Sequence, residues 1–284
     1  MTVNSDRQTR IRRGGVGWRA LAYTLLIGAS LLTLLPLLYM VSLSLQTEAE
    51  TLSGEPVLVP EVLRFSNYLE LFERSPFERF MLNSLITAGA ITVSHLLFDP
   101  LIGYVFAKFR FPFRNTMFVM LLATLMVPLF VRMIPLYVAM ANLGWLNSYQ
   151  ALITPFLMDA FGIFLMRQFI QPIPDDLLKA ARIDGASEFR IYWQIVLPQA
   201  RPALAVLGLF TFVFQWNEFL WPLVVTTTEE MRTIPVGLTL FNQEYFTLWH
   251  LTSAGSVLLF LPTALLFLFS QRYFVRGITL SGLR

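Results

Sequence analysis

Long apolar runs dominate this chain, and its polar positions gather between them. Six runs contain few charged side chains and reach the roughly 17 to 25 residues that cross a hydrocarbon core. They do not alternate like barrel strands and are about twice as long, so backbone hydrogen bonding in lipid requires helices. We therefore predict an all-α membrane protein with six transmembrane helices. The predicted spans are about 20–45, 81–107, 117–140, 151–169, 203–225 and 251–269.

Composition supports a bilayer, not water, as the solvent of this chain. Hydrophobic residues make up 56% of it and charged residues 14%, against roughly 25% charged in soluble domains. Mean hydropathy is +0.61. Five arginines precede the first run, but that run is longer than the apolar core of about 7 to 15 residues in a secretory signal peptide. We predict an uncleaved first span after a cytoplasmic tail, residues 1–19, and a single transmembrane domain over residues 20–284.

Lys and Arg are distributed unevenly between the runs. Sixteen lie in the N-terminal tail, the connections 108–114 and 167–201, and the C-terminal tail, whereas four lie in the opposite connections. The positive-inside rule places the richer side, and with it both termini, in the cytoplasm. This bias accounts for the net charge of +3, so we expect no nucleic-acid partner. The chain has no Cys and only two distant histidines, His95 and His250, so we expect no metal site.

The connection 171–199 has the pattern of a helical bracket. Pro174 and the acidic residues after it favour a helix that begins at Asp175, because proline and negative charge suit a first helical turn. Gly185 is expected to end this helix with a tight turn. Ser187 is a candidate cap for a second helix.

The second helix is predicted to have one apolar face. Phe189, Trp193 and Val196 recur at helical spacing, and Pro198 is expected to end the pattern. By periodicity alone, the two short helices could equally lie on the bilayer surface as amphipathic helices.

The bracket also carries a recognisable motif. Its spacing matches Glu-Ala-Ala, three residues, Gly, nine residues, Ile, one residue, Leu-Pro, except that Lys179 replaces the Glu. This resembles the EAA loop of permease subunits of bacterial ATP-binding-cassette importers, a coupling helix that docks onto a separate ATPase. The resemblance implies an ATPase-coupling role for Lys179, Ala180, Ala181, Asp184, Gly185, Ile195, Leu197 and Pro198.

The similarity extends over nearly the whole chain from Asn67 onward. It is closest to the second permease subunit of maltose-type and oligosaccharide importers, in stretches such as Asn83-Ser84 and 216–222. It implies a multi-pass protein of the bacterial cytoplasmic (inner) membrane that translocates a carbohydrate, a di- or oligosaccharide, delivered by an extracytoplasmic binding protein. It also implies a second homologous permease subunit in a heterodimer, surrounding membrane lipid, and two ATPase subunits that hold ATP and Mg.

The sequence agrees with ATP binding on a separate subunit. It contains no G-x-x-x-x-G-K-[ST] phosphate-binding loop. We therefore expect a transporter subunit with no enzymatic activity and no bound cofactor of its own.

The fifth predicted span holds the candidate translocation path. Sugars need hydrogen-bonding side chains and aromatic rings, and one stretch supplies both, about two thirds of the way across the bilayer. The candidates are Gln215, Trp216, Asn217, Glu218 and Trp221.

Charged residues inside the spans suggest an ion pair. Arg132, Asp159 and Glu218 all fall in the outer half of the membrane by helical rise, where an unpaired charge is costly. We predict that Arg132 pairs with Asp159 or Glu218. Direct sugar contact by these residues, or Arg132 reaching the interface by snorkelling, are the alternatives.

Other functions fit the sequence less well. A phosphate substrate such as glycerol-3-phosphate or a glycerophosphodiester would use the same architecture but needs cationic groups, and Arg132 alone lies within a span. A membrane enzyme would need clustered ligands or a nucleophile with a base, and a scaffold or receptor module would not need intramembrane carboxylates or the bracket.

Overall fold

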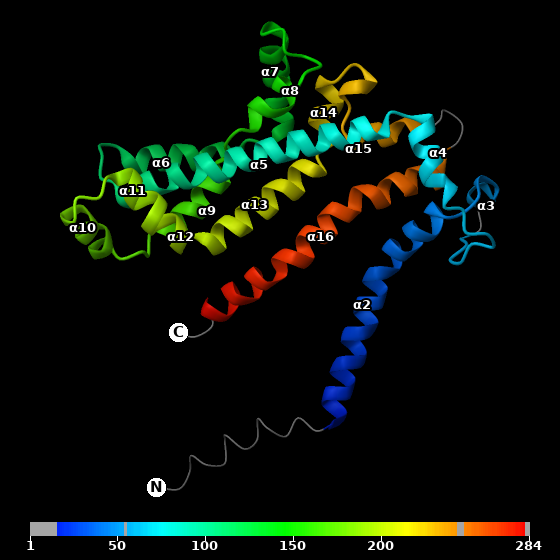
Figure 1. The fold of residues 1–284 in the computed structure, drawn as a ribbon, viewed down its shortest axis with the longest axis horizontal. Helices are drawn as coiled ribbons and strands as arrows, with labels where there is room; N and C mark the ends of the chain where they lie inside the picture. The colour runs from blue at the N-terminus through cyan, green and yellow to red at the C-terminus, as the bar shows by residue number, and fades with distance from the viewer. Residues whose placement is uncertain (1–15, 54–55, 243–246, 282–284) are drawn as a thin grey trace.

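The computed structural model describes residues 16–53, 56–242 and 247–281 as a helical molecule (Figure 1). Within these ranges the extended pairing is limited to one isolated bridge between Asn242 and Thr247. The four arginines before residue 16 and the last three residues lie outside the described residues. The helices are α2 (Val16–Ser44), α3 (Glu48–Leu52), α4 (Ser66–Arg74), α5 (Phe77–Lys108), α6 (Arg114–Ala123), α7 (Leu129–Asn142), α8 (Tyr149–Ile153), α9 (Ala160–Ile170), α10 (Asp175–Ile183), α11 (Glu188–Ile191), α12 (Leu197–Gln199), α13 (Arg201–Trp216), α14 (Leu220–Val225), α15 (Ile234–Gly237) and α16 (Trp249–Ser281).

Three helices in the described ranges are long and apolar enough to cross a membrane unbroken. They are α2, α5 and α16, and they match the first, second and sixth predicted spans. None of the most apolar window of α2 is buried, and 22% of that of α16 is. Such apolar surface is stable in contact with lipid or another membrane helix, so these helices confirm a membrane protein.

The other predicted spans are interrupted. The third bends by 97° between its α6 and α7 portions, and the fourth by 42° between α8 and α9. The α11–α12 segment and α13 form a further pair bent by 79°. The described chain thus offers three spans, or up to six if each bent pair counts as one.

The fifth span differs from the prediction of one helix over 203–225. The helix α13 ends at Trp216, and the separate helix α14 begins at Leu220. The Glu218 carboxylate explains the break, because its Oε1 accepts hydrogen bonds from the backbone N–H groups of Leu220, at 3.1 Å, and Trp221, at 3.2 Å. The side chain thereby satisfies donors that open the next helix.

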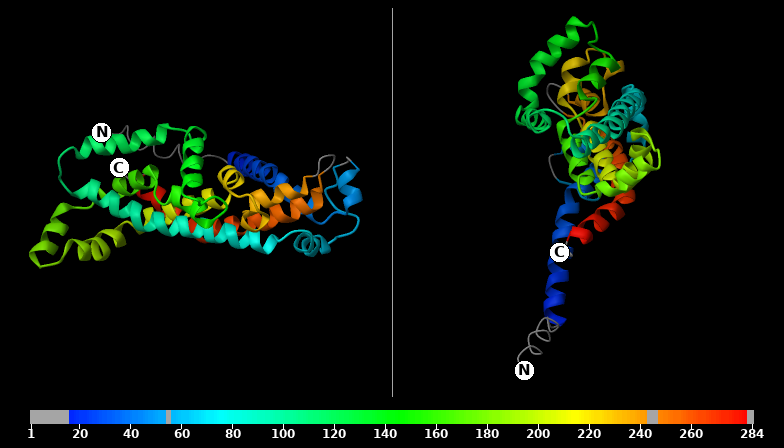
Figure 2. Two further views of the ribbon diagram at one scale, coloured as in Figure 1. Left: turned by 90° about the horizontal axis from the view of Figure 1, so that it is seen from above. Right: turned by 90° about the vertical axis from the view of Figure 1, so that its left-hand side faces the viewer.

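Several connections lie at the two ends of the long axis. Figure 1 shows α10 to α12 and the end of α5 at one end, with α3 and α4 at the other. The helices α5, α13 and α16 follow the long axis between them, and α7 stands across it, as the end-on view in Figure 2 also shows. The basic connections 108–114 and 171–199 therefore share one end.

Two clusters of buried apolar side chains stabilise these ends. One joins the bracket to α5, α9 and α13 through Tyr104, Met166, Ile191 and Val196. The other lies at the opposite end around Phe77, Phe80, Trp216 and Leu251. Each cluster fixes the ends of the long helices against the connections beside them.

A glycine sets the distance between α5 and α9. A Cβ on Gly103 would lie 2.9 Å from the Arg167 backbone nitrogen and 2.9 Å from the Met166 Cβ. We expect Gly103→Ala to destabilise the chain by about 1–3 kcal/mol, because overpacked backbone cannot yield locally. Thermal unfolding of purified protein in detergent measures this. Gly89→Ala on the same helix, where a Cβ would meet nothing within 4 Å, is the control and should be neutral or stabilising; equal melting temperatures would contradict the close approach.

Candidate functional site

The first helix of the bracket forms as the sequence predicts. The helix α10 begins at Asp175 and has two acidic residues in its first turn. Gly185 adopts a φ of +79°, a left-handed conformation that side chains disfavour. The Ser187 Oγ accepts a hydrogen bond from the Arg190 backbone N–H at 3.3 Å and so caps the next helix. The predicted turn and caps are confirmed.

The second half of the bracket differs from prediction. A π-helical segment, Tyr192–Val196, joins α11 to α12, so the chain stays helical through Pro198 instead of ending there. The wider turn lies where the proline lacks an N–H donor. It also changes the register of the apolar side chains. Val196 is buried, whereas Phe189 and Trp193 remain 71% and 45% exposed, so these three residues do not share one face.

A buried lysine attaches the bracket to α5. The Lys108 ammonium donates hydrogen bonds to the carbonyls of Gln171, at 3.1 Å, and Ile173, and it lies 2.7 Å from the Asp175 carboxylate. Its side chain is 4% exposed. The ammonium holds the pKa of Asp175 below its usual range. One cation thus holds both the chain entering the bracket and the first turn of α10.

A second attachment lies deeper in the bracket. The Arg182 Nε lies 2.6 Å from Glu188 Oε1, and the Tyr104 hydroxyl donates to Glu188 Oε2 at 3.0 Å. The Arg182 guanidinium lowers the pKa of Glu188. The two bracket helices are therefore tied to each other and to α5 by the same carboxylate.

The motif residues divide into two groups by exposure. Lys179, Ala180, Asp184 and Gly185 are exposed, and Ile183 between them is 86% exposed. Leu197 is buried, while Ala181, Ile195 and Pro198 are half-buried. The first part of the motif is thus available to a partner, and the second part packs against the helices.

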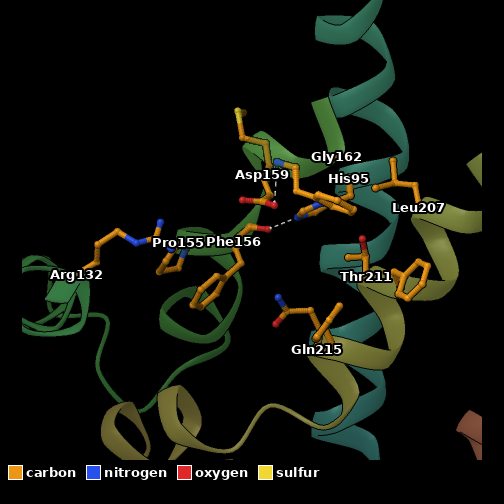
Figure 3. A pocket seen from close by; sticks show the side chains of 13 residues that line it. His95, Arg132, Pro155, Phe156, Asp159, Gly162, Leu207, Thr211 and Gln215 are labelled. Atoms are coloured by element: carbon orange, nitrogen blue, oxygen red, sulfur yellow. Dashed lines mark hydrogen bonds between the residues drawn. The ribbon is translucent and has the colours of Figure 1, made fainter. Parts of the chain in front are cut away.

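A cavity of about 450 Å³ lies between α5, α7, α9 and α13. Figure 3 shows side chains from all four helices around it. The polar side chains in its wall are His95, Arg132, Asp159, Thr211 and Gln215. Its aromatic side chains are Phe156, Phe161, Phe210 and Phe214.

Three polar residues of α5 support the break in the fourth span beside this cavity. The Ser94 hydroxyl donates to the carbonyl of Leu157, and His95 Nε2 lies 2.9 Å from the carbonyl of Phe156. Asp99 Oδ1 accepts from the Asp159 backbone N–H at 3.4 Å. Backbone groups that leave a helix in the membrane need such partners.

The buried His95–Asp99 pair has no net charge. His95 Nδ1 lies 2.8 Å from Asp99 Oδ2, and the two residues are 5% and 0% exposed. A carbonyl only accepts, so Nε2 carries a hydrogen toward Phe156. Unprotonated Nδ1 and Oδ2 would repel each other at this distance, so one of them carries a second proton, and the pair is neutral whichever atom holds it.

The predicted path residues separate in the structure. Among the five, Gln215 lines the cavity. Trp216 and Trp221 are buried, and their indole N–H groups donate to the carbonyls of Leu259, at 2.8 Å, and Ala151, at 2.9 Å. Asn217 and Glu218 lie in the break after α13, where the Asn217 amide donates to the carbonyl of Val213.

The predicted ion pair does not form within the described chain. Arg132 and Asp159 both line the cavity, but no acidic oxygen lies within 4.0 Å of the guanidinium there. Backbone N–H groups occupy the carboxylates instead, that of Phe161 for Asp159 and those of Leu220 and Trp221 for Glu218. Arg132 is exposed.

Sequence reasoning missed the residues that position the site. Lys108 entered only the charge count, and the roles of Tyr104 and Glu188 were not anticipated. The helical spacing of Ser94, His95 and Asp99 inside an apolar run is the signal that could have revealed a supported helix break, because such polar groups rarely face lipid.

Broken spans, a protruding helical bracket and an intramembrane polar cavity define a helical membrane permease. Residues 100–280 match the family described as binding-protein-dependent transport system inner membrane component. The chain belongs to this family of ATP-binding-cassette importer subunits, as its sequence motif indicated.

Individual transport proteins are also similar to this chain. The chain is 37% identical over 258 residues to the arabinooligosaccharides transport system permease AraQ of Bacillus subtilis (strain 168), covering 90% of this chain and 92% of AraQ. It is 40% identical over 206 residues to the sn-glycerol-3-phosphate permease UgpE of Yersinia pestis bv. Antiqua (strain Antiqua), covering 72% and 73%. A bacterial ABC transporter involved in the import of the acidic polysaccharide alginate has a similar structure, with a TM-score of 0.79, 26% identity and coverage of 96% and 99%.

The Lys108 attachment can be tested directly. We expect Lys108→Met to lower the substrate-stimulated ATPase rate of the assembled importer several-fold, since two carbonyls and a carboxylate lose their buried partner. Arg110→Met, an exposed cation in the same connection, is the control and should stay within about twofold. Equal rates for both variants would show that the attachment does not hold the bracket.

Proposed function

We propose that this chain is the carbohydrate-translocating permease of an importer whose bracket transmits ATP-driven movement. The bracket carries the argument. It protrudes at one end, exposes the first half of its motif, and presents the apolar side chains of Ile183, at 86%, and Phe189, at 71%. Exposed apolar groups of this kind mark interaction surfaces, and the resemblance of the motif to the EAA loop supports a separate ATPase as the partner.

The topology proposed for this chain has six spans and both termini in the cytoplasm of a bacterium. The basic connections share the end that carries the bracket, which supports this orientation. The inner membrane is the location that the family description names.

The partners follow from the family and from the apolar surfaces. An extracytoplasmic binding protein would deliver the substrate, as the family description implies; a structure of a bacterial alginate ABC transporter in complex with an alginate pentasaccharide-bound periplasmic protein shares this fold at 17% identity and a TM-score of 0.60. A second, homologous permease subunit would cover helices that the single chain leaves bare. ATP and Mg would bind to two separate ATPase subunits, with no cofactor on this chain.

A carbohydrate is the favoured substrate. AraQ, an arabinooligosaccharide permease, matches the chain over 90% of its length. The cavity wall contains one cation, Arg132, and also the acidic side chain of Asp159, a poor environment for a phosphate. Import of glycerol-3-phosphate or a glycerophosphodiester is the second candidate, favoured by the 40% identity to UgpE.

Import by the reconstituted complex tests the function. The chain is assembled in proteoliposomes with the partner subunits and binding protein encoded beside it, and uptake of radiolabelled arabinotriose, maltotriose and sn-glycerol 3-phosphate is measured. We expect ATP-dependent uptake of a neutral sugar. Gly185→Leu should lower it about tenfold or more, since a left-handed backbone costs a side chain about 1–3 kcal/mol and the added bulk lies on the docking surface.

Gly185→Asn separates these effects, because asparagine tolerates the left-handed region. It should retain most of the uptake. Full uptake and normal ATPase assembly with Gly185→Leu would refute the coupling role of the bracket, whereas uptake restricted to the phosphate would favour the second candidate.

Cysteine labelling tests the orientation. The chain has no natural Cys, so Ser53→Cys and Ser187→Cys each introduce one thiol. We expect a membrane-impermeant maleimide to label position 53 from outside intact cells, and position 187 only after permeabilisation. Labelling of position 187 in intact cells would reverse the topology.

A further inference from the structure

The cavity between α5, α7, α9 and α13 contains polar side chains that the fold does not use. The side chains of Arg132, Thr211 and Gln215 form no hydrogen bond or ion pair with any described residue. Thr211 is nevertheless only 9% exposed. Gln215 is half-buried and Arg132 is exposed, so these three side chains can offer hydrogen-bonding atoms to a ligand in the cavity without first breaking a contact within the protein.

The other two polar residues in the wall, His95 and Asp159, already contact protein groups. His95 lies against protein groups at both ring nitrogens, with Nδ1 2.8 Å from Asp99 Oδ2 and Nε2 2.9 Å from the carbonyl of Phe156. Asp159 binds the Phe161 backbone N–H through Oδ2, at 3.1 Å, which leaves Oδ1 available. The wall therefore offers one acceptor at Asp159, a donor group at Arg132, and groups at Thr211 and Gln215 that both donate and accept.

The charges in the wall cancel. The cation of Arg132 is balanced by the anion of Asp159, and the proton count above makes His95 and Asp99 neutral together. An anionic ligand would be attracted by Arg132 and repelled to a similar degree by Asp159. An uncharged ligand with several hydroxyl groups satisfies all of the free donors and acceptors without this cost.

The remaining wall suits the apolar face of a sugar ring. Phe156 lies beside Pro155 in Figure 3, and Phe161, Phe210 and Phe214 add further aromatic surface. The volume of about 450 Å³ falls in the roughly 300–1,000 Å³ range of small-molecule sites. Aromatic rings with a few convergent polar groups are the usual composition of such sites.

We propose that this cavity is a subsite of this subunit for an uncharged sugar unit of the transported oligosaccharide, with Thr211, Gln215 and Asp159 hydrogen-bonded to its hydroxyls. The proposal rests on the importer function above. It keeps Gln215 of the predicted path and replaces Trp216, Asn217, Glu218 and Trp221 with Thr211 and Asp159, which line the cavity. The residues Ser94, His95 and Asp99 are positioning residues, because they fix the backbone that presents Asp159.

Near-isosteric variants test the subsite. Thr211→Val and Gln215→Leu remove hydrogen-bonding atoms, and Thr92→Val and Gln168→Leu are matched controls on α5 and α9 that do not line the cavity. Equilibrium binding of radiolabelled arabinotriose and maltotriose to the purified complex, without binding protein, is the readout. We expect each cavity variant to weaken binding of whichever sugar the wild type imports about fivefold, and the double variant about 25-fold if the effects add.

A conservative variant distinguishes loss of the hydrogen bond to the sugar from loss of folding. Thr211→Ser keeps the hydroxyl and should bind within about twofold of wild type, and thermal unfolding reports whether each variant is folded. If the cavity variants stay folded and bind the imported sugar like wild type, the cavity holds water only and the subsite is refuted while the importer function stands. If the wild-type complex imports no sugar probe, the proposed function itself fails, and the subsite with it.

A charge change tests the ligand class. Asp159→Asn preserves a good helix N-cap but leaves the wall with a net positive charge. We expect it to raise binding of an alginate trisaccharide several-fold relative to maltotriose. An unchanged preference, or a wild type that binds the charged probes best, would overturn the assignment to an uncharged sugar.

Discussion

The need to satisfy backbone hydrogen bonds inside the bilayer governs this structure. A continuous helix meets that need by itself, and α2, α5 and α16 do so. At two of the breaks a polar side chain supplies the missing partner. Ser94, His95 and Asp99 do this for the break before α9, and Glu218 does it for the break after α13. These four polar side chains are therefore explained by the breaks, and three of them lie beside the cavity, which the broken fourth span helps to line.

The sequence predicted what depends on length, hydropathy and local caps. It located the apolar runs, the start of α10, the left-handed Gly185 and the Ser187 cap, because each is determined within a few residues. Hydropathy alone did not locate the bends, since a long apolar run looks the same whether the helix inside it is straight or broken. Contacts between residues distant in sequence, such as His95 with Phe156, show where a break is supported.

The same limit explains the misassigned side chains. Helical spacing put Phe189, Trp193 and Val196 on one face, but the π-helical turn between them shifts the register. Trp216 and Trp221 carry both an apolar ring and a polar N–H, which suits a sugar site and a helix contact equally well. Their bonds to carbonyls of Leu259 and Ala151 assign them to helix packing. Helical rise predicted Arg132 and the carboxylates at similar depth in the membrane, yet backbone N–H groups near each carboxylate bind it instead.

One helix contacts both the bracket and the wall of the cavity. The helix α5 holds the bracket through Lys108 and Tyr104, and it supports the wall of the cavity through Asp99 and His95. Asp99 and Lys108 are nine residues apart, about 14 Å along a helix. Gly103 lies between them, where α9 meets α5 without an intervening side chain. A displacement of the bracket would therefore be applied to the same pair of helices that positions Asp159, so the proposed ATPase-driven movement would reach the cavity through direct contacts.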